Sequence, residues 1–245
     1  MIKLVDLQMS FGDRVILRDV NMTIAKGETL VVIGPSGTGK STLLRLLIGL
    51  ERPTGGQVLI NDKDIGRMSE KELDEIRFDM GMVFQYSALF DSMTVGDNVA
   101  FGLRQHTKMT EAEIRRTVEE LLDVVGLAGY ADAMPSELSG GMKKRVGLAR
   151  ALAFKPSIIL YDEPSSGLDP IMSRKIDELI AAMQARFGVT SIVVTHDMES
   201  AYRVADRIAV LYEGRFVEIA SPEEIRTSTH PFVAEFVRAA GSRKE

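Results

Sequence analysis

A glycine-rich run at residues 34–41 has the residue types and spacing to bind the phosphates of a nucleotide. It reads Gly-Pro-Ser-Gly-Thr-Gly-Lys-Ser and fits the pattern G-x-x-x-x-G-K-[ST]. Glycines let the backbone curl so that successive N–H groups point inward and form an anion nest at the start of a helix. The lysine can neutralise the outer phosphates, and the last serine hydroxyl can bind Mg²⁺. The predicted phosphate-binding residues are Gly34, Pro35, Ser36, Gly37, Thr38, Gly39, Lys40, Ser41 and Thr42.

Two adjacent carboxylates, Asp162 and Glu163, follow a second apolar run. Asp162 ends a predicted strand, where open α/β sheets bind ligands, so we predict that it holds Mg²⁺ directly or through water. Glu163 is predicted to act as general base toward the attacking water. Adjacent residues cannot lie on both sides of one bond, so the pair favours phosphoryl transfer over glycoside hydrolysis. Taken alone, Asp162 and Glu163 could also be a solvated turn after a strand. The glycine-rich run at 34–41 favours a catalytic site over that alternative.

These side chains need elements that hold them in place. Short β-rich runs alternate with helical ones along the chain, which predicts an α/β fold. Thr29–Ile33 is predicted as a buried strand leading into the glycine run, and Thr42–Leu50 as the apolar helix after it. The nearly continuous apolar character of the strands predicts a sheet covered on both faces. The other predicted strands are Gln57–Ile60, Gly81–Phe84, Ser157–Tyr161, Ser191–Thr195 and Arg207–Tyr212.

The pattern turns helical from about residue 86 to residue 154, which predicts a helical subdomain inserted into the α/β core. Thr110–Glu113 fits a capping box that opens one of its helices. A further helix start, at Ser221–Glu224, has proline at its first position. The apolar stripe beyond it either docks on the chain's own core, which we favour, or binds a partner. Its members are Phe232, Val233, Phe236 and Val237.

The composition excludes several classes of protein. The chain has 245 residues with 30 Lys+Arg and 35 Asp+Glu, and its net charge of −5 gives no reason to expect nucleic-acid binding. The absence of cysteine excludes disulfides and thiolate metal sites. Residues 1–6 lack the layout of a signal peptide, and the longest apolar run, Leu43–Leu50, is far shorter than the about 20 residues that a membrane span needs. We therefore expect a soluble chain that is not exported.

Further residues resemble the motifs of one family, the ABC ATPases. Leu138–Met142 reads Leu-Ser-Gly-Gly-Met and resembles the signature of that family, whose usual form is L-S-G-G-Q. Gln85 matches the Q-loop, Ser166–Asp169 resembles the D-loop, and His196 matches the switch histidine. The motifs occur in the family's order, and the resemblance covers residues 1–220.

The resemblance implies a fold and a division of the chain. The expected fold is a P-loop NTPase core of the RecA-like type, with an antiparallel β subdomain and an inserted helical subdomain. The ABC ATPase domain would cover residues 1–220, with its core at about 1–85 and 155–220 and the helical subdomain at about 86–154. Residues 221–245 would form a short C-terminal helical tail.

The resemblance also implies roles for single residues. Glu163, His196 and Gln85 would be the catalytic residues. Gln85 would bind Mg²⁺ or water through its amide, and His196 would hydrogen-bond the γ-phosphate. Phe11 falls where the family has an aromatic that stacks on adenine, a contact worth roughly 1–3 kcal/mol; packing in the core is an equal alternative for it. The other residues expected at bound ATP are Ser139, Gly140, Gly141 and Asp169. The basic residues that follow the signature, Lys143, Lys144 and Arg145, are predicted to form a solvated basic face.

In this family the signature segment closes over the ATP of a partner subunit. The resemblance therefore implies a head-to-tail homodimer that binds two ATPs, with Mg²⁺ as cofactor and ATP hydrolysis as the activity. ATP binding would close the pair, and loss of the γ-phosphate would open it. The motion would pass to integral membrane permease subunits, which places the chain on the cytoplasmic face of the inner membrane as a peripheral protein.

Two short segments narrow the resemblance to one branch of the family. Met142–Arg145 and Tyr86–Val95 look like the ATPase of MCE-linked phospholipid transporters, the Mla type. That likeness implies lipid transport, with an MCE-type lipid-binding protein and a small regulatory subunit as further partners. Two alternatives stay open: the ATPase of an amino-acid importer, and a nucleotide-dependent switch that signals without transport. Four apolar residues either line the groove for a permease helix or pack the helical insert: Ala88, Leu89, Phe90 and Met93.

Overall fold

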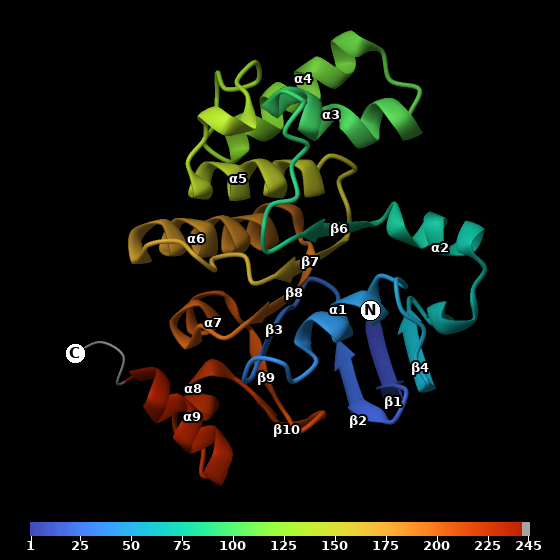
Figure 1. Ribbon diagram of the computed structural model, residues 1–245, viewed down its shortest axis with the longest axis vertical. Coiled ribbons are helices and arrows are strands. Elements are labelled where there is room, and N and C mark those ends of the chain that lie inside the picture. The colour runs from blue at the N-terminus through green and yellow to red at the C-terminus, as the bar shows by residue number, and fades with distance from the viewer. Residues whose placement is uncertain (242–245) are drawn as a thin grey trace.

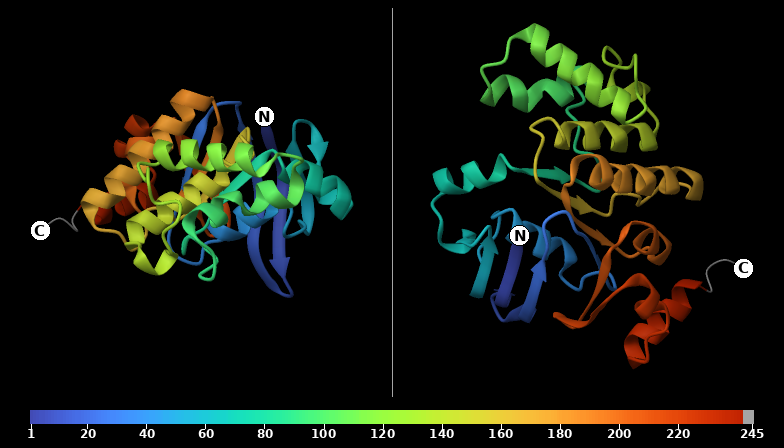
Figure 2. Two further views of the ribbon diagram at one scale, coloured as in Figure 1. Left: turned by 90° about the horizontal axis from the view of Figure 1, so that it is seen from above. Right: turned by 180° about the vertical axis from the view of Figure 1, so that it is seen from behind.

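The computed structural model describes residues 1–241, so residues 242–245 of the predicted tail lie outside the described residues. Figure 1 shows the sheets in the middle of the molecule and helices at both ends, and the view from behind keeps this order (Figure 2). The helices at one end are α3 (Val95–His106), α4 (Glu111–Val124) and α5 (Gly140–Ala151). The helices at the other end are α8 (Pro222–Arg226) and α9 (Pro231–Gly241).

Within residues 1–241 the larger sheet has six strands, in the order β10-β9-β3-β8-β7-β6. All are parallel to their neighbours except β10, which is antiparallel to β9. Parallel strands end at one edge of the sheet, so the segments after β3, β7 and β8 meet there. The bounds are β3 Thr29–Ile33, β6 Met80–Val83, β7 Ile158–Asp162, β8 Thr190–Thr195, β9 Arg207–Tyr212 and β10 Arg215–Ala220.

This larger sheet is buried on both faces, as the apolar strands predict. Successive residues of β3 alternate between two hydrophobic cores, with Val31 and Ile33 in one and Leu30 and Val32 in the other. The first core also takes in α3 to α9, and the second takes in α1 and the smaller sheet. Three further helices are α1 (Lys40–Leu47), α6 (Pro170–Phe187) and α7 (Met198–Val204).

A smaller antiparallel sheet, in the order β2-β1-β4-β5, packs on the second core. The prediction that Gln57–Ile60 joins a sheet covered on both faces is wrong, because β4 belongs to this smaller sheet. Val58 and Ile60 are buried while Leu59 between them is partly exposed, which is the alternation of a strand with one face on the core. The bounds are β1 Ile2–Phe11, β2 Arg14–Ile24, β4 Gly55–Ile60 and β5 Lys63–Asp64.

Local sequence sets the ends of several helices. Thr110 and Glu113 exchange hydrogen bonds between side chain and backbone, so the predicted capping box of α4 is confirmed. Helix α8 begins as predicted, with Ser221 as its cap and proline at its first position. Helix α1 ends at Leu47, earlier than predicted, because Gly49 adopts a φ of 70° that ends helical backbone.

The apolar stripe of α9 docks on the chain's own core, which is the interpretation we favoured. Val233 is fully buried, and the ring of Phe232 stacks on Tyr212 with centroids 3.7 Å apart and planes 20° apart. Phe236 and Val237 are partly buried against the same core. The stripe is therefore covered by the end of β9 and its neighbours.

Several described elements are not predicted by the sequence pattern. They are β1, β2, β5, β10, α2 (Glu70–Arg77), α6, α7, and the 3-10 turns at Ile65–Arg67 and Pro135–Glu137. Helix α2 does carry a readable signal, the capping box formed by Ser69 and Glu72.

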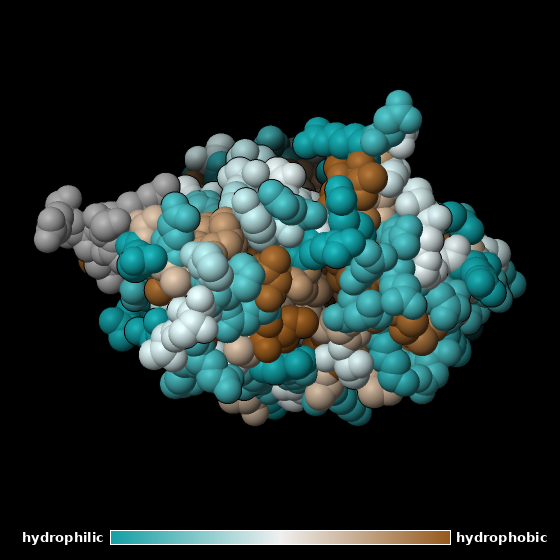
Figure 3. Space-filling model, turned by 90° about the horizontal axis from the view of Figure 1, so that it is seen from below, coloured by the Kyte–Doolittle hydropathy of each residue, from teal (hydrophilic) through white to brown (hydrophobic). Residues whose placement is uncertain are grey.

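No helix in the described part of the chain is long and apolar enough to cross a bilayer. On the face seen from below, hydrophilic side chains cover most of the surface and apolar ones form separate patches (Figure 3).

Candidate functional site

The glycine-rich loop joins β3 to α1, and two of its positions admit only glycine. At Gly34 a Cβ would lie 2.2 Å from the carbonyl oxygen of Leu211. Gly39, the N-cap of α1, has a φ of 104°, which other residues rarely adopt. A cavity of about 410 Å³ opens beside the loop and is lined in part by residues 35–38. The loop therefore curls into an open space at the carboxyl end of the central strand.

Lys40, the first residue of α1, folds back into this loop. Its Nζ donates hydrogen bonds to the carbonyl oxygens of Gly34 at 2.8 Å and Pro35 at 3.0 Å. Burial lowers the pKa of Lys40, and the negative charges of Glu163 and Asp162 oppose that change. A phosphate would offer this ammonium charged acceptors in place of the two neutral carbonyls, which makes a stronger interaction.

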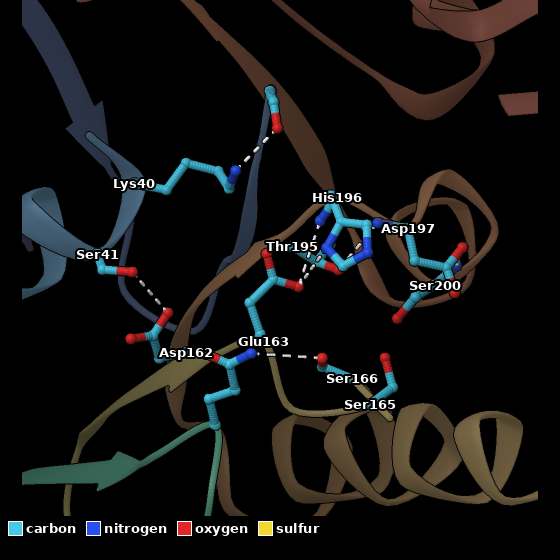
Figure 4. A network of polar contacts seen from close by, with 12 residues as sticks. Lys40, Ser41, Asp162, Glu163, Ser165, Ser166, Thr195, His196, Asp197 and Ser200 are labelled. Atoms are coloured by element: carbon cyan, nitrogen blue, oxygen red, sulfur yellow. Dashed lines mark hydrogen bonds and ion pairs between the residues drawn. The ribbon is translucent and has the colours of Figure 1, made fainter. Parts of the chain in front are cut away.

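The structure places Asp162, at the end of β7, beside Ser41 of α1. Ser41 Oγ donates a hydrogen bond of 3.0 Å to Asp162 Oδ1 (Figure 4). Burial raises the pKa of Asp162 above its ordinary value of 3.8; the Ser41 hydrogen bond opposes this rise and the charge of Glu163 adds to it. Hydroxyl and carboxylate oxygens are the ligands that Mg²⁺ prefers, so this pair fits the predicted ion.

The protein supplies only part of such a coordination shell. Among residues 1–241 no group of three His, Cys, Asp or Glu side chains could hold a metal ion. Mg²⁺ usually keeps several waters and binds through one or two carboxylates together with substrate phosphates. The pair Ser41 and Asp162 therefore fits an ion that arrives with a phosphate ligand.

Glu163 directly follows β7 and His196 directly follows the neighbouring strand β8, and the two side chains contact each other. The Nδ1 atom of His196 lies 2.9 Å from Oε2 of Glu163 (Figure 4). The Glu163 side chain is 14% exposed and the His196 side chain 49% exposed. Both residues line a cavity of about 720 Å³, together with Ser166. A carboxylate with a partly open approach and an orienting histidine can accept a proton from a bound water.

The other residues predicted by resemblance are placed as follows. Gln85, just after β6, donates from Nε2 to Ser166 Oγ at 3.4 Å, so it lies near the same cavity. Asp169 caps α6 and accepts the backbone N–H groups of Ile171 and Met172. Phe11 is 47% exposed, so it is not part of the core, and its face is open for stacking.

The segment 139–141 opens helix α5, away from the glycine-rich loop. Ser139 is the N-cap and accepts the N–H of Met142 at 3.3 Å. At Gly141 a Cβ would lie 2.6 Å from the Met172 side chain, so the segment packs on α6. No hydrogen bond or ion pair within the described chain joins it to residues 34–41. The chain therefore has two separate helix starts that could meet anions, and one subunit does not bring them together.

Comparison with known proteins shows which family the chain belongs to. The family model described as "ABC transporter" matches residues 17–166, more than half of the chain. The chain belongs to the ABC transporter family. Solved ABC structures also share the fold. A dimeric ATP-binding cassette in a post-hydrolysis state, bound to ADP and phosphate, has a TM-score of 0.82 at 36% identity and covers 91% of this chain and 99% of its own. The cbiO1 protein of Clostridium perfringens has a TM-score of 0.86 at 33% identity and covers 99% and 95%.

Relatives within the ABC family are named for the transport of different substrates. The probable ribonucleotide transport ATP-binding protein mkl of Mycobacterium tuberculosis is 48% identical over 94% of this chain, which spans only 64% of that relative. The intermembrane phospholipid transport ATP-binding protein MlaF of Haemophilus influenzae is 42% identical over 97% of this chain and 90% of its own length. The methionine import ATP-binding protein MetN of Mesorhizobium japonicum is 45% identical over 89% of this chain and 59% of its own.

One prediction about the basic residues after the ABC signature is wrong. Lys144 does not lie on a solvated face: it is 7% exposed, and its Nζ donates to the carbonyl oxygens of Gln85 and Glu163. Arg145 donates to the carbonyls of Val125 and Gly126, just beyond α4. The positions of these side chains depend on how α5 packs, and no local pattern signals that.

The four apolar residues after Gln85 differ in how deeply they are buried. Leu89 packs partly buried against the core of the inserted helices. Ala88 is exposed and Phe90 is 43% exposed. The ring centroids of Phe90 and Phe101 lie 4.9 Å apart. Met93 is half-buried. Packing therefore accounts for Leu89, while Ala88 and Phe90 lie at the surface.

Proposed function

We propose that the chain is the ATP-binding and hydrolysing subunit of an ABC transporter, working as a head-to-tail homodimer around two ATPs. The observation that carries the proposal is the edge of the larger sheet where three strands end together. There Lys40 and Ser41 from α1 face Asp162, which ends β7, and Glu163, which follows it. His196, just after β8, contacts Glu163. A phosphate nest, a Mg²⁺ pair and a base lie side by side.

The residues divide the work of phosphoryl transfer between them. The N–H groups of the glycine-rich loop hold the β- and γ-phosphates, and Lys40 exchanges its two carbonyl acceptors for phosphate oxygens. Ser41 and Asp162 hold Mg²⁺ with help from the amide of Gln85. When bound, Mg²⁺ neutralises charge on the phosphate oxygens.

Glu163 is the general base in this proposal. It accepts a proton from the attacking water as the water oxygen forms its bond to the γ-phosphorus and the bond to the β-phosphate oxygen breaks. His196 holds Oε2 of Glu163 at 2.9 Å and lies where it can hydrogen-bond the γ-phosphate. Phe11, exposed at the end of β1, stacks on the adenine.

The second subunit supplies the missing half of each site. Ser139, Gly140 and Gly141 open α5 far from the loop of their own chain, so they would meet the γ-phosphate held by the partner. Asp169, at the start of α6, would lie at the same interface. The similar cassette solved as a dimer with ADP and phosphate supports this arrangement. ATP closes the pair and its hydrolysis opens it, because the closed state alone makes these contacts.

We assign the transported substrate to the lipids, with separate integral membrane permease subunits, an MCE-type lipid-binding protein and a small regulatory subunit as partners. Support comes from the similarity to MlaF over 90% of that protein and from the segments Met142–Arg145 and Tyr86–Val95. The exposed Ala88 and Phe90 beside Gln85 offer an apolar surface to a permease helix. The chain would then lie on the cytoplasmic face of the inner membrane.

A second candidate is the ATPase of an amino-acid importer. The methionine import relative is 45% identical, which is as close as the phospholipid one. A switch without transport has less support, because both Glu163 and His196 are present and in contact.

The experiment is purification of the tagged full-length chain from membranes in mild detergent, with identification of the bound proteins and lipids. A permease together with an MCE-type protein and phospholipid would support the lipid assignment. An importer permease with a solute-binding protein would refute it and leave the ATPase proposal intact. The variant Phe90→Ala tests the apolar surface: the expected permease should no longer co-purify with it, while the purified chain should still hydrolyse ATP.

A further inference from the structure

Helix α5 holds the loop after β6 through three residues on one of its faces. Lys144 Nζ donates to the carbonyl oxygen of Gln85 at 3.1 Å. Arg150 donates from Nη2 to Ser87 O at 2.8 Å and from Nη1 to Ala88 O at 2.6 Å. Gly147 lies between the two cations, and a Cβ there would be 3.5 Å from Ser87 O. Residues three apart share a helix face, so the loop 85–88 lies directly along α5.

This loop has a backbone that needs external support. Ser87 has a φ of 60° and Ala88 a φ of 45°, both in the left-handed region that costs energy for residues other than glycine. Such conformations persist only where the surroundings fix them. The guanidinium of Arg150 binds the carbonyls of both strained residues, so α5 and the loop are expected to move as one body.

Lys144 also reaches the turn that carries Glu163. Its Nζ donates to Glu163 O at 3.3 Å, and the same oxygen accepts the N–H of Ser166 at 3.1 Å. The N–H of Glu163 donates to Val194 O, and its φ of 48° is again left-handed. The direction in which the Glu163 carboxylate leaves the backbone is therefore fixed by these hydrogen bonds, and Lys144 contributes one of them.

We propose that Lys144 is a positioning residue for ATP hydrolysis, which ties the strained turn of Glu163 to the loop of Gln85 and to the helix that begins at the signature. The inference rests on the proposed function, since Glu163 is the base only there. It has a mechanical consequence: a partner that displaces loop 85–88 also displaces the backbone of Glu163 through one ammonium group.

A purely space-filling role does not explain the ammonium. Lys144 is 7% exposed, and burial lowers its pKa while the charge of Glu163 opposes that change. An apolar side chain of the same length would fill the space without the cost of desolvating a charge. An apolar side chain has no N–H donors, so it could not form the bridge that Lys144 Nζ makes between the carbonyl oxygens of Gln85 and Glu163.

The test compares three variants of the full chain: Lys144→Met, Lys144→Arg and, as matched control, Lys143→Met. Lys143 is the neighbouring lysine on α5, and its ammonium makes no hydrogen bond or ion pair with the described residues. We expect Lys144→Met to lower kcat for ATP hydrolysis by about 10-fold or more, because small misplacements of a reacting group are costly. Binding of a fluorescent ATP analogue should stay within about two-fold, since the phosphate nest is untouched. Lys144→Arg should restore part of kcat, and Lys143→Met should leave it unchanged.

A double-mutant cycle with Glu163→Gln separates positioning from general support of the fold. In the Glu163→Gln background the change Lys144→Met should lower the residual rate by less than about two-fold, because the base it positions is already gone. An equal fall in both backgrounds would overturn the proposal, as would a normal kcat for Lys144→Met. If Lys144→Met does not fold, full activity of Lys144→Gln, which has the wrong reach for both carbonyls, would overturn it. A wild-type chain without ATPase activity, or full activity of Glu163→Gln, would instead refute the proposed function.

Discussion

Replacing Glu163 by Gln should strongly lower the rate of ATP hydrolysis while ATP binding and folding remain. The amide has the size of the carboxylate and offers both a donor and an acceptor, so the 2.9 Å contact with His196 Nδ1 can persist. The backbone of Glu163 also keeps its bonds to Val194, Ser166 and Lys144. What disappears is the basic oxygen. General base catalysis contributes typically 10²–10⁴-fold, so kcat should fall by that factor, which is about 2.7–5.4 kcal/mol of activation free energy.

The assay is phosphate release at saturating ATP and Mg²⁺, with equilibrium binding of a fluorescent ATP analogue and light scattering for the dimer. The free energy of unfolding should stay within about 1 kcal/mol of the wild type, because no packing is lost. Glu178→Gln is the control, since it makes the same change on an exposed carboxylate that pairs with Arg174 on α6. A kcat within three-fold of wild type, on the order of RT in free energy, would refute the assignment of Glu163 as the base. Loss of ATP binding would refute the claim that its carboxylate acts on turnover alone.

Three further substitutions test other parts of the site and its support. Lys40→Ala should weaken ATP binding by at least about 100-fold, or about 2.7 kcal/mol, because the phosphates lose their charged donor; normal affinity by calorimetry would contradict the whole phosphate site. Met142→Gln should leave the ATPase rate within about two-fold, since the expected phosphate contacts come from Ser139 and Gly141; a large change would show that residue 142 itself takes part. Asp177→Asn should destabilise the chain by about 1–3 kcal/mol, because the Asp177 carboxylate is buried between Ser200 and Arg203 of α7. Burial raises the pKa of Asp177 in the folded protein above its ordinary value of 3.8. The bound proton therefore stabilises the folded wild type fully below pH 3.8, and this stabilisation is lost as the pH rises through the raised pKa. The difference in unfolding free energy between the two proteins should therefore narrow with rising pH in denaturant titrations, and a widening difference would contradict the reasoning.

The inner strands of the larger sheet could be predicted closely because their information is local. Thr29–Ile33 and Arg207–Tyr212 are strands with the predicted bounds, since a strand buried on both faces is apolar at every position. The smaller sheet was harder to predict. Its strands mix buried and exposed positions, and so does β10, the edge strand of the larger sheet, so no continuous apolar run marks them. The pairing of β1 with β4 joins segments far apart in the chain, which no local pattern contains.

The sequence by itself determined the chemistry of the candidate site. Glycines at 34 and 39, a lysine and a serine after them, and two carboxylates behind an apolar run specify phosphates, Mg²⁺ and a base through residue type and spacing alone. It also determined that the buried strand Thr29–Ile33 leads through the glycine-rich run into a helix, because these elements follow one another along the chain.

Only the tertiary structure decided which of these groups meet. The parallel order β3-β8-β7 brings Ser41 to Asp162 and His196 to Glu163, although those pairs are separated by 121 and 33 positions in the chain. It also decided that Lys144 is buried against two carbonyl oxygens instead of solvated. A side chain's partners depend on the faces that its helix presents to the rest of the fold, and those faces are set by long-range packing that local sequence does not encode.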